Sequence, residues 1–177
     1  MTNLTQKIFS GAAIRIATLA LFLVVFGASA AHTATITVTA ADDQVPWTAT
    51  GTAVITSVTK LPGGLIQLDG FVLGNATHLG DVTGPATRIQ DHQGNFGTTL
   101  VFIGANGKDS VFLSVSGQSE TSKDKCLITS TGTYTVTGGT GAFANATGSG
   151  TIDSQIDLCA GTAVGEYTGT ISRPHLN

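Results

Sequence analysis

The sequence predicts an all-β protein in which consecutive strands are joined by short turns. Apolar and polar residues alternate with a period of two, most clearly over 129–137, where every odd position is Thr. Turn signals rich in Gly, Pro and Asn interrupt the alternation at intervals of roughly 10–15 residues. No segment after residue 30 carries a sustained helical period. Antiparallel strands arranged in this way form either an up-and-down barrel or a sandwich.

The first 30 residues have the pattern of a secretory signal peptide. Lys7 and Arg15 supply positive charge, an apolar run covers 16–26, and Ala28-Ser29-Ala30 offers a small-x-small cleavage site. The apolar run is shorter than the ~20 residues that a membrane span needs. A buried N-terminal helix or an uncleaved anchor is the alternative. We expect 1–30 to be a signal peptide, 31–177 to be a single domain without stable membrane insertion, and the product to be secreted, extracellular or periplasmic.

The charge of the expected domain argues against nucleic acid as a partner. Residues 31–177 hold all 11 acidic residues but only six basic ones, which gives a net charge of −5. The basic residues are scattered, so the chain has no basic patch for phosphate backbones or anionic membranes. The oligomeric state is left open by the sequence.

The first half of the domain contains four predicted strands. Residues 33–39 alternate and are ended by acidic residues and Pro46, after which Trp47, the only Trp, is expected in the core or as a plug at a barrel end. Two strands follow over 49–61 and 65–73, separated by Pro62-Gly63-Gly64. A tight connection at 74–80 leads into 81–89. In that strand Pro85 removes a ladder donor, which predicts an edge strand or a bulge.

The second half of the domain contains five more predicted strands, which makes about nine in total. Strands at 96–104 and 109–118 flank Asn106-Gly107, the strongest short signal for a hairpin. A second hairpin pairs 129–137 with 144–156 around a Gly-rich tip, and a last strand covers 163–172. If 141–144 forms the tip, paired residue numbers sum to about 285, as do those of Cys126 and Cys159. We therefore expect a structural disulfide between them, with a thiol nucleophile or a metal ligand as the alternative.

Several segments resemble a known group of proteins. GNATHLGDVTG (74–84), IGANGKDSVF (103–112), GTYTVTGGTGAFANATGSGTI (132–152) and GEYTGTISRP (165–174) resemble, in that order, small secreted bacterial proteins without an assigned function. The GGTGAF core at 138–143 is also similar to the glycine-rich hairpin of the allene oxide cyclase and dirigent barrels. The resemblance implies an eight-stranded (eight to nine) antiparallel up-and-down β-barrel with a central cavity. It also implies cyclase or isomerase activity by substrate positioning.

Five side chains are candidates for a site. Asp69 could be an inward-facing general acid or base with a pKa raised by burial, or it could mark the solvent face with Gln67. Tyr134 is a further catalytic candidate, and Tyr134 and Tyr167 lie on faces that point inward, so they could line a cavity or be ordinary core aromatics. Arg88 could bind a substrate carboxylate or pair with a surface acid. His78 could relay protons at a barrel rim or merely stabilise its turn.

We expect neither a metal nor another cofactor. The four His residues are scattered, with no HxH or HExxH spacing. Three functions are consistent with the sequence. The domain could bind one small, mostly apolar molecule in a barrel cavity. It could be a cyclase or isomerase of the allene oxide cyclase or dirigent type. It could also be a structural or surface-interaction protein with a filled core.

Overall fold

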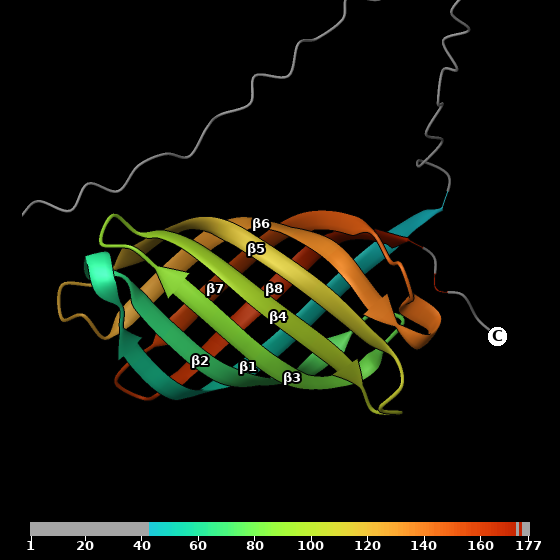
Figure 1. Cartoon of the computed structure of the whole chain (residues 1–177), viewed down its shortest axis with the longest axis horizontal. Helices are drawn as coiled ribbons and strands as arrows, with labels where there is room; N and C mark the ends of the chain where they lie inside the picture. The colour runs from blue at the N-terminus through green and yellow to red at the C-terminus, as the bar shows by residue number, and fades with distance from the viewer. Residues whose placement is uncertain (1–42, 173, 175–177) are drawn as a thin grey trace, which may run out of the picture. The chain divides into compact units, whose positions relative to one another are not determined.

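The computed structural model describes residues 43–172 and 174, and these residues form a closed, all-β barrel. Each of the eight strands is antiparallel to its neighbours in sequence, and β8 returns to pair with β1 (Figure 1). The predicted eight-stranded antiparallel up-and-down barrel is therefore confirmed. The strands are β1 (Gln44–Lys60), β2 (Ile66–Ala76), β3 (Gly80–Gln90), β4 (Asn95–Gly104), β5 (Ser110–Thr121), β6 (Leu127–Thr140), β7 (Gly148–Asp157) and β8 (Thr162–Ser172).

Two expectations lie outside the described residues. These are the signal peptide over 1–30 and the strand over 33–39, which would have been a ninth strand. The eight strands of the described region close the barrel by themselves, since β1 is hydrogen-bonded to both β2 and β8.

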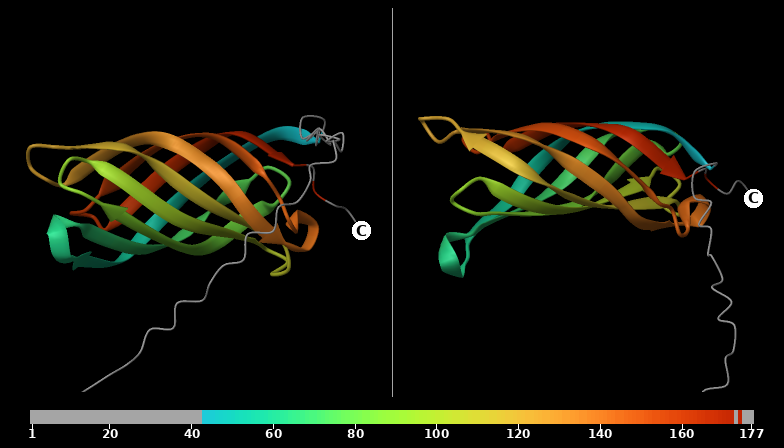
Figure 2. Two further views of the ribbon diagram at one scale, coloured as in Figure 1. Left: turned by 45° about the horizontal axis from the view of Figure 1, so that its top comes forward. Right: turned by 90° about the horizontal axis from the view of Figure 1, so that it is seen from above.

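The turns gather at two opposite ends of the barrel (Figure 2). The β1–β2, β3–β4, β5–β6 and β7–β8 connections lie at one end, which we call the disulfide end. It includes the short 3-10 helix η1 (Pro62–Gly64). The other end holds the start of β1, the end of β8 and the 3-10 helix η2 (Gly141–Phe143), and we call it the Trp47 end.

Two proline expectations are corrected by the structure. Pro46 does not precede the strand but belongs to β1, where it pairs with Thr170 near the start of the strand. Pro85 lies on β3, which has a neighbour on both sides, so β3 is not an edge strand. The β3–β4 ladder is interrupted between the Thr83–Ile103 and Ala86–Leu100 pairs and resumes in the same register, so there is no bulge either. Pro85 lies within this interruption, where β3 and β4 are not paired, so the N–H group that proline lacks is not needed for the β3–β4 ladder.

The disulfide-bonded hairpin forms as predicted, in a register shifted by one residue. Pairs of β6 and β7 such as Leu127–Asp157 and Tyr134–Gly150 have numbers that sum to 284 rather than 285. Cys126 and Cys159 lie just beyond the ladder and form a disulfide with a Cα–Cα distance of 5.2 Å. The bond joins the β5–β6 and β7–β8 connections, and no free cysteine is left in the chain.

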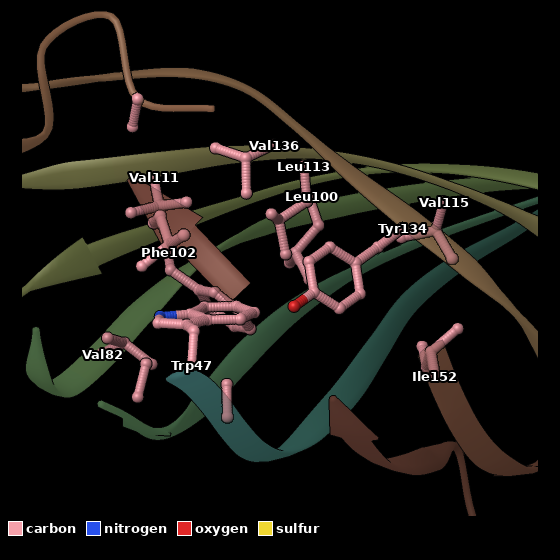
Figure 3. Close-up of a cluster of buried hydrophobic side chains, with 14 of the residues drawn as sticks. Trp47, Val82, Leu100, Phe102, Val111, Leu113, Val115, Tyr134, Val136 and Ile152 are labelled. Atoms are coloured by element: carbon pink, nitrogen blue, oxygen red, sulfur yellow. The ribbon is translucent and has the colours of Figure 1, made fainter. Parts of the chain in front are cut away.

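Inward-facing side chains at the Trp47 end and in the middle of the barrel fill the interior. Trp47 is fully buried, as expected of a core residue, and lies 5.3 Å from Tyr134 and 6.1 Å from Phe102 between ring centroids. Figure 3 shows Tyr134 reaching from β6 toward Trp47, with Leu100 and Leu113 beside it. We call this group the aromatic cluster. A smaller apolar cluster, built on Leu68, Ile128 and Ile156, lies at the disulfide end.

Candidate functional site

The barrel interior contains a cavity of about 110 Å³. Its wall includes Leu68 and Ile156 of the smaller apolar cluster, Leu100 of the aromatic cluster, and Ile152, which belongs to the same buried core as Leu100. The cavity therefore lies between the two clusters, in the half of the barrel nearer the disulfide end. Because engineered apolar cavities of about 150 Å³ bind benzene, this volume is sufficient for part of a small organic molecule.

The cavity exists because small residues occupy inward-facing positions of β1, β2, β3 and β8. A barrel of eight strands has an interior that ordinary side chains can fill, so a void requires side chains that are too short to reach the axis. The small residues of the wall are Gly51, Ala53, Gly70, Ala86, Ala163 and Gly165. Larger apolar side chains complete the wall, so most of it is hydrophobic, as in typical ligand pockets.

Arg88, on the inward face of β3, is the one cationic residue of the cavity wall. It is 7% exposed, and its guanidinium lies 3.7 Å from the centroid of the Phe96 ring. Nε and Nη2 donate to Gln90 Oε1 at 3.3 and 2.9 Å, and Nη2 also donates to Ser130 at 3.0 Å and to Ser119. Burial lowers the pKa of Arg88 to about 10, so the side chain is a cation at neutral pH.

No carboxylate balances this charge within the described residues. The hydrogen-bond partners of Arg88 are an amide and two hydroxyls, all neutral. The only charge effect on its pKa comes from Tyr167. Nη1 donates to no residue of the region that the structure describes. The sequence-based alternative, in which Arg88 pairs with a surface acid, does not apply to this side chain because it points inward.

The two tyrosines both face inward, but only Tyr167 lines the cavity. Tyr167 packs on Phe102 and Tyr134 at centroid distances of 5.7 and 5.9 Å, and it shares the cavity wall with Arg88. Burial raises its pKa, partly opposed by the charge of Arg88, so its hydroxyl stays protonated.

Tyr134 lies within the aromatic cluster and is not among the residues of the cavity wall. Burial raises its pKa to about 12. Its hydroxyl approaches the main chain of β8 near Thr170, but it has no partner in hydrogen-bonding geometry among the described residues. A ligand in the cavity would therefore meet Tyr167 and not Tyr134. Of the two alternatives that the sequence allowed, Tyr167 lines the cavity and Tyr134 is a core aromatic.

The sequence allowed Asp69 to face either the barrel interior or the solvent, and in the structure its carboxylate lies on the solvent face. Although Asp69 is among the residues of the cavity wall, its carboxylate accepts hydrogen bonds from Gln67 (2.9 Å), Thr87 (2.8 Å) and Ser57 (2.9 Å). These bonds lower the pKa of Asp69, the opposite of the raised value expected of a buried general acid. Ser57 reaches Asp69 because the β1–β2 register shifts between Ile55 and Ser57.

His78 lies far from the cavity. It occupies the β2–β3 turn at the Trp47 end, is exposed, and has a positive φ of 67°. The cavity is in the opposite half of the barrel and His78 is not part of its wall. The sequence-based alternative of a proton relay at the mouth of this cavity therefore does not apply, and the alternative of a turn residue remains.

The sequence analysis missed the polar residues that surround Arg88. Gln90, Ser119 and Ser130 hold the guanidinium, while Thr98 and Ser154 add hydroxyls to the cavity wall. A signal was present, since Ser130 shares its inward face with Ile128, Gly132 and Tyr134. Serine is common on both faces of these strands, however, so the pattern alone did not single it out.

The residues that the structure describes contain no group of three or more His, Cys, Asp or Glu side chains placed to hold a metal ion. They also contain no helix that is long and apolar enough to cross a membrane. Comparison of the chain with protein-family models, with curated proteins and with solved structures finds no match.

Proposed function

We propose that the protein is a secreted barrel that binds a small, mostly apolar molecule in its cavity. The observation that carries the proposal is a cavity of about 110 Å³ with a mostly apolar wall and few polar groups, among them Arg88 and Tyr167. Burial of an apolar ligand surface against such a wall contributes about 25 cal/mol per Å² to binding, and the polar groups orient the ligand.

Secretion is the second part of the proposal. The Cys126–Cys159 disulfide supports it, because such bonds persist in oxidising compartments and are rare in a reducing cytosol. The pattern of residues 1–30 supports it as well. Expression with an affinity tag at the C-terminus, followed by N-terminal sequencing of the exported product, tests cleavage after Ala30. Retention of residues 1–30 on the exported protein would contradict it.

Native mass spectrometry of the exported protein tests ligand binding. We expect a co-purifying small molecule, or binding of an added apolar probe such as 1-octanol, that is weakened by Ala163→Leu. Ala163 lines the cavity, and the added isopropyl group would occupy part of it. Ala160→Leu is the matched control, because Ala160 is exposed in the β7–β8 turn. Equal binding by the two variants would place the ligand elsewhere, and no binding by the wild type would refute the proposal.

A cyclase or isomerase of the allene oxide cyclase or dirigent type is the second candidate. The observation that favours it is the presence of a cation, Arg88, and a protonated phenol, Tyr167, on the wall of one cavity. Such groups could hold a reactive substrate in one conformation, and positioning alone can contribute much of a rate acceleration. If the protein is such an enzyme, Tyr167→Phe should lower kcat more than it weakens substrate binding. An unchanged kcat would exclude this role for Tyr167.

A further inference from the structure

We infer that the ligand is an organic monocarboxylate whose apolar body lies in the cavity and whose carboxylate is bound by Arg88. This inference rests on the proposed function and specifies the chemical class of the ligand. It depends on three features of Arg88: its missing counter-ion, its unused donors and its position on an otherwise apolar wall.

The missing counter-ion is the first feature. Arg88 is only 7% exposed, yet its hydrogen-bond partners among the described residues are all neutral. Buried charges in proteins are normally paired, because an isolated ion in the interior loses its hydration. A buried cation that lacks a protein anion and borders a cavity is therefore a binding group for an anion supplied from outside.

The unused donors are the second feature. A guanidinium offers five N–H groups in a planar fork. Gln90, Ser119 and Ser130 occupy Nε and Nη2, and Phe96 covers one face of the plane, so the group is held in one orientation. Nη1 donates to none of the described residues, which leaves its N–H groups for a ligand. The Tyr167 hydroxyl, also without a hydrogen bond to any residue of this region, is a further donor on the same wall.

The surroundings of Arg88 are the third feature, and they select the kind of anion. The cavity wall offers one cation, so a dianion such as a phosphate monoester would bring a second charge without a partner. A carboxylate brings one charge and accepts two N–H bonds in the geometry that Arg presents. Leu68, Leu100, Ile152 and Ile156 form an apolar wall that only a ligand with a hydrocarbon body can use. A short fatty acid or a comparable aliphatic or aromatic acid meets both requirements.

Paired probes of equal chain length test the inference. Isothermal titration calorimetry at pH 7 compares sodium octanoate with 1-octanol on the wild type, on Arg88→Met and on Arg88→Lys. We expect octanoate to bind the wild type about 10- to 100-fold more tightly than octanol, the range expected for hydrogen bonds to a charged group. Arg88→Met should remove this preference while octanol still binds, and Arg88→Lys should keep part of it because it retains the charge.

The outcomes separate the inference from the proposed function. If the wild type binds octanol as tightly as octanoate, the carboxylate inference is overturned and the apolar site stands. If neither probe binds, the proposed function fails with it. If sodium chloride displaces octanoate at equal concentration, Arg88 is a site for inorganic anions and the inference is also overturned.

A measurement on the wild type alone keeps the test decisive if Arg88→Met fails to fold. The carboxyl resonance of ¹³C-labelled octanoate reports its ionisation. When the carboxylate lies against Arg88, the pKa of the bound acid should fall below its free value, since a nearby cation favours the charged form. An unchanged or raised pKa of the bound acid would show that its carboxyl group does not contact the guanidinium.

Discussion

Arg88→Met should stabilise the ligand-free protein, and the expected size follows from the pKa of the side chain. The pKa of Arg88 falls from 12.5 to about 10 in the folded state because of burial. A difference of one in pKa corresponds to ~1.36 kcal/mol, so holding Arg88 charged destabilises the folded protein by about 3 kcal/mol at neutral pH. Methionine removes the charge and can keep the contact with Phe96.

The substitution also removes favourable interactions, which reduces the gain. Ser119 and Ser130 already lie within hydrogen-bonding distance of each other, at 3.0 Å, and can satisfy one another once the guanidinium is gone. Gln90 loses its partner but is only partly buried. A hydrogen bond to a charged group contributes about 1.5–3 kcal/mol, so losing the bond to Gln90 offsets at least half of the gain, and we expect a net stabilisation of up to about 1.5 kcal/mol.

Urea denaturation followed by Trp47 fluorescence measures the change, since Trp47 is the only Trp and is fully buried. The midpoint should rise with an unchanged slope. The pH dependence carries the sign of the pKa shift. Because the folded pKa is below the unfolded one, the penalty is complete well below pH 10 and declines as the pH rises from about 10 toward 12.5. The difference between wild type and variant should therefore narrow above pH 10.

A destabilisation of more than about 1 kcal/mol by Arg88→Met would refute this reasoning. It would mean that the hydrogen bonds and the stacking on Phe96 outweigh the loss of hydration. Arg88 would then be a structural group that holds the strands together, and its lack of a counter-ion would no longer indicate a ligand.

Three other perturbations have definite expected results. Replacing Cys126 and Cys159 by Ala should lower the free energy of unfolding by about 3–4 kcal/mol, because the bond closes a separation of 33 residues. Gly150→Ala should destabilise by about 1–3 kcal/mol, since the new Cβ would overlap the main chain of β8, whereas Gly97→Ala has no atom within 4 Å to meet and should be neutral or slightly stabilising. Asp69→Asn should leave octanoate binding unchanged. It should also lower the free energy of unfolding at neutral pH. Because the pKa of Asp69 is lowered in the folded state, the ionised carboxylate stabilises the wild type above the ordinary Asp pKa, and this contribution is lost as the pH falls.

Each of these can be checked by urea denaturation, and each has a contrary outcome. The cysteine variant is compared with wild type treated with a reducing agent, and unequal losses would mean that the alanines act through something other than the missing bond. Equal effects of the two Gly substitutions would show that β7 and β8 are not closely packed at that point. Weaker octanoate binding by Asp69→Asn would show that this carboxylate takes part in the site after all.

The alternation of residue types was sufficient to predict the fold and which way most side chains face. Tyr134 and Tyr167 were placed on inward faces from their neighbours two residues away, and the structure agrees. Pairing was harder to predict, because it depends on the turn. The β6–β7 register differs by one residue from the value inferred from the Gly-rich tip, and the shift between Ile55 and Ser57 has no clear local signal. In a strand a shift of one residue exchanges the two faces.

The location of the cavity could not be derived from single strands. Whether an inward side chain meets a void depends on the sizes of residues at the same level of other strands, which are distant in the sequence. Tyr134 and Tyr167 have similar local patterns, yet Tyr134 is enclosed by the aromatic cluster while Tyr167 borders the cavity. The small residues Ala53, Ala86 and Gly165 open space beside Tyr167, and they come from β1, β3 and β8.

The cavity and the disulfide lie in the same half of the barrel, and their energetics are connected. The Trp47 end is stabilised by tight packing of large rings. The disulfide end contains the cavity, where side chains do not pack against one another, and the charged Arg88 without a counter-ion. Both features reduce stability, as binding sites commonly do. The disulfide joins the two connections that flank the β6–β7 hairpin at that end, so its stabilisation acts where packing contributes least. A ligand that filled the void and paired with Arg88 would remove both costs at once, so the hydrophobic body and the carboxylate should reinforce each other in binding.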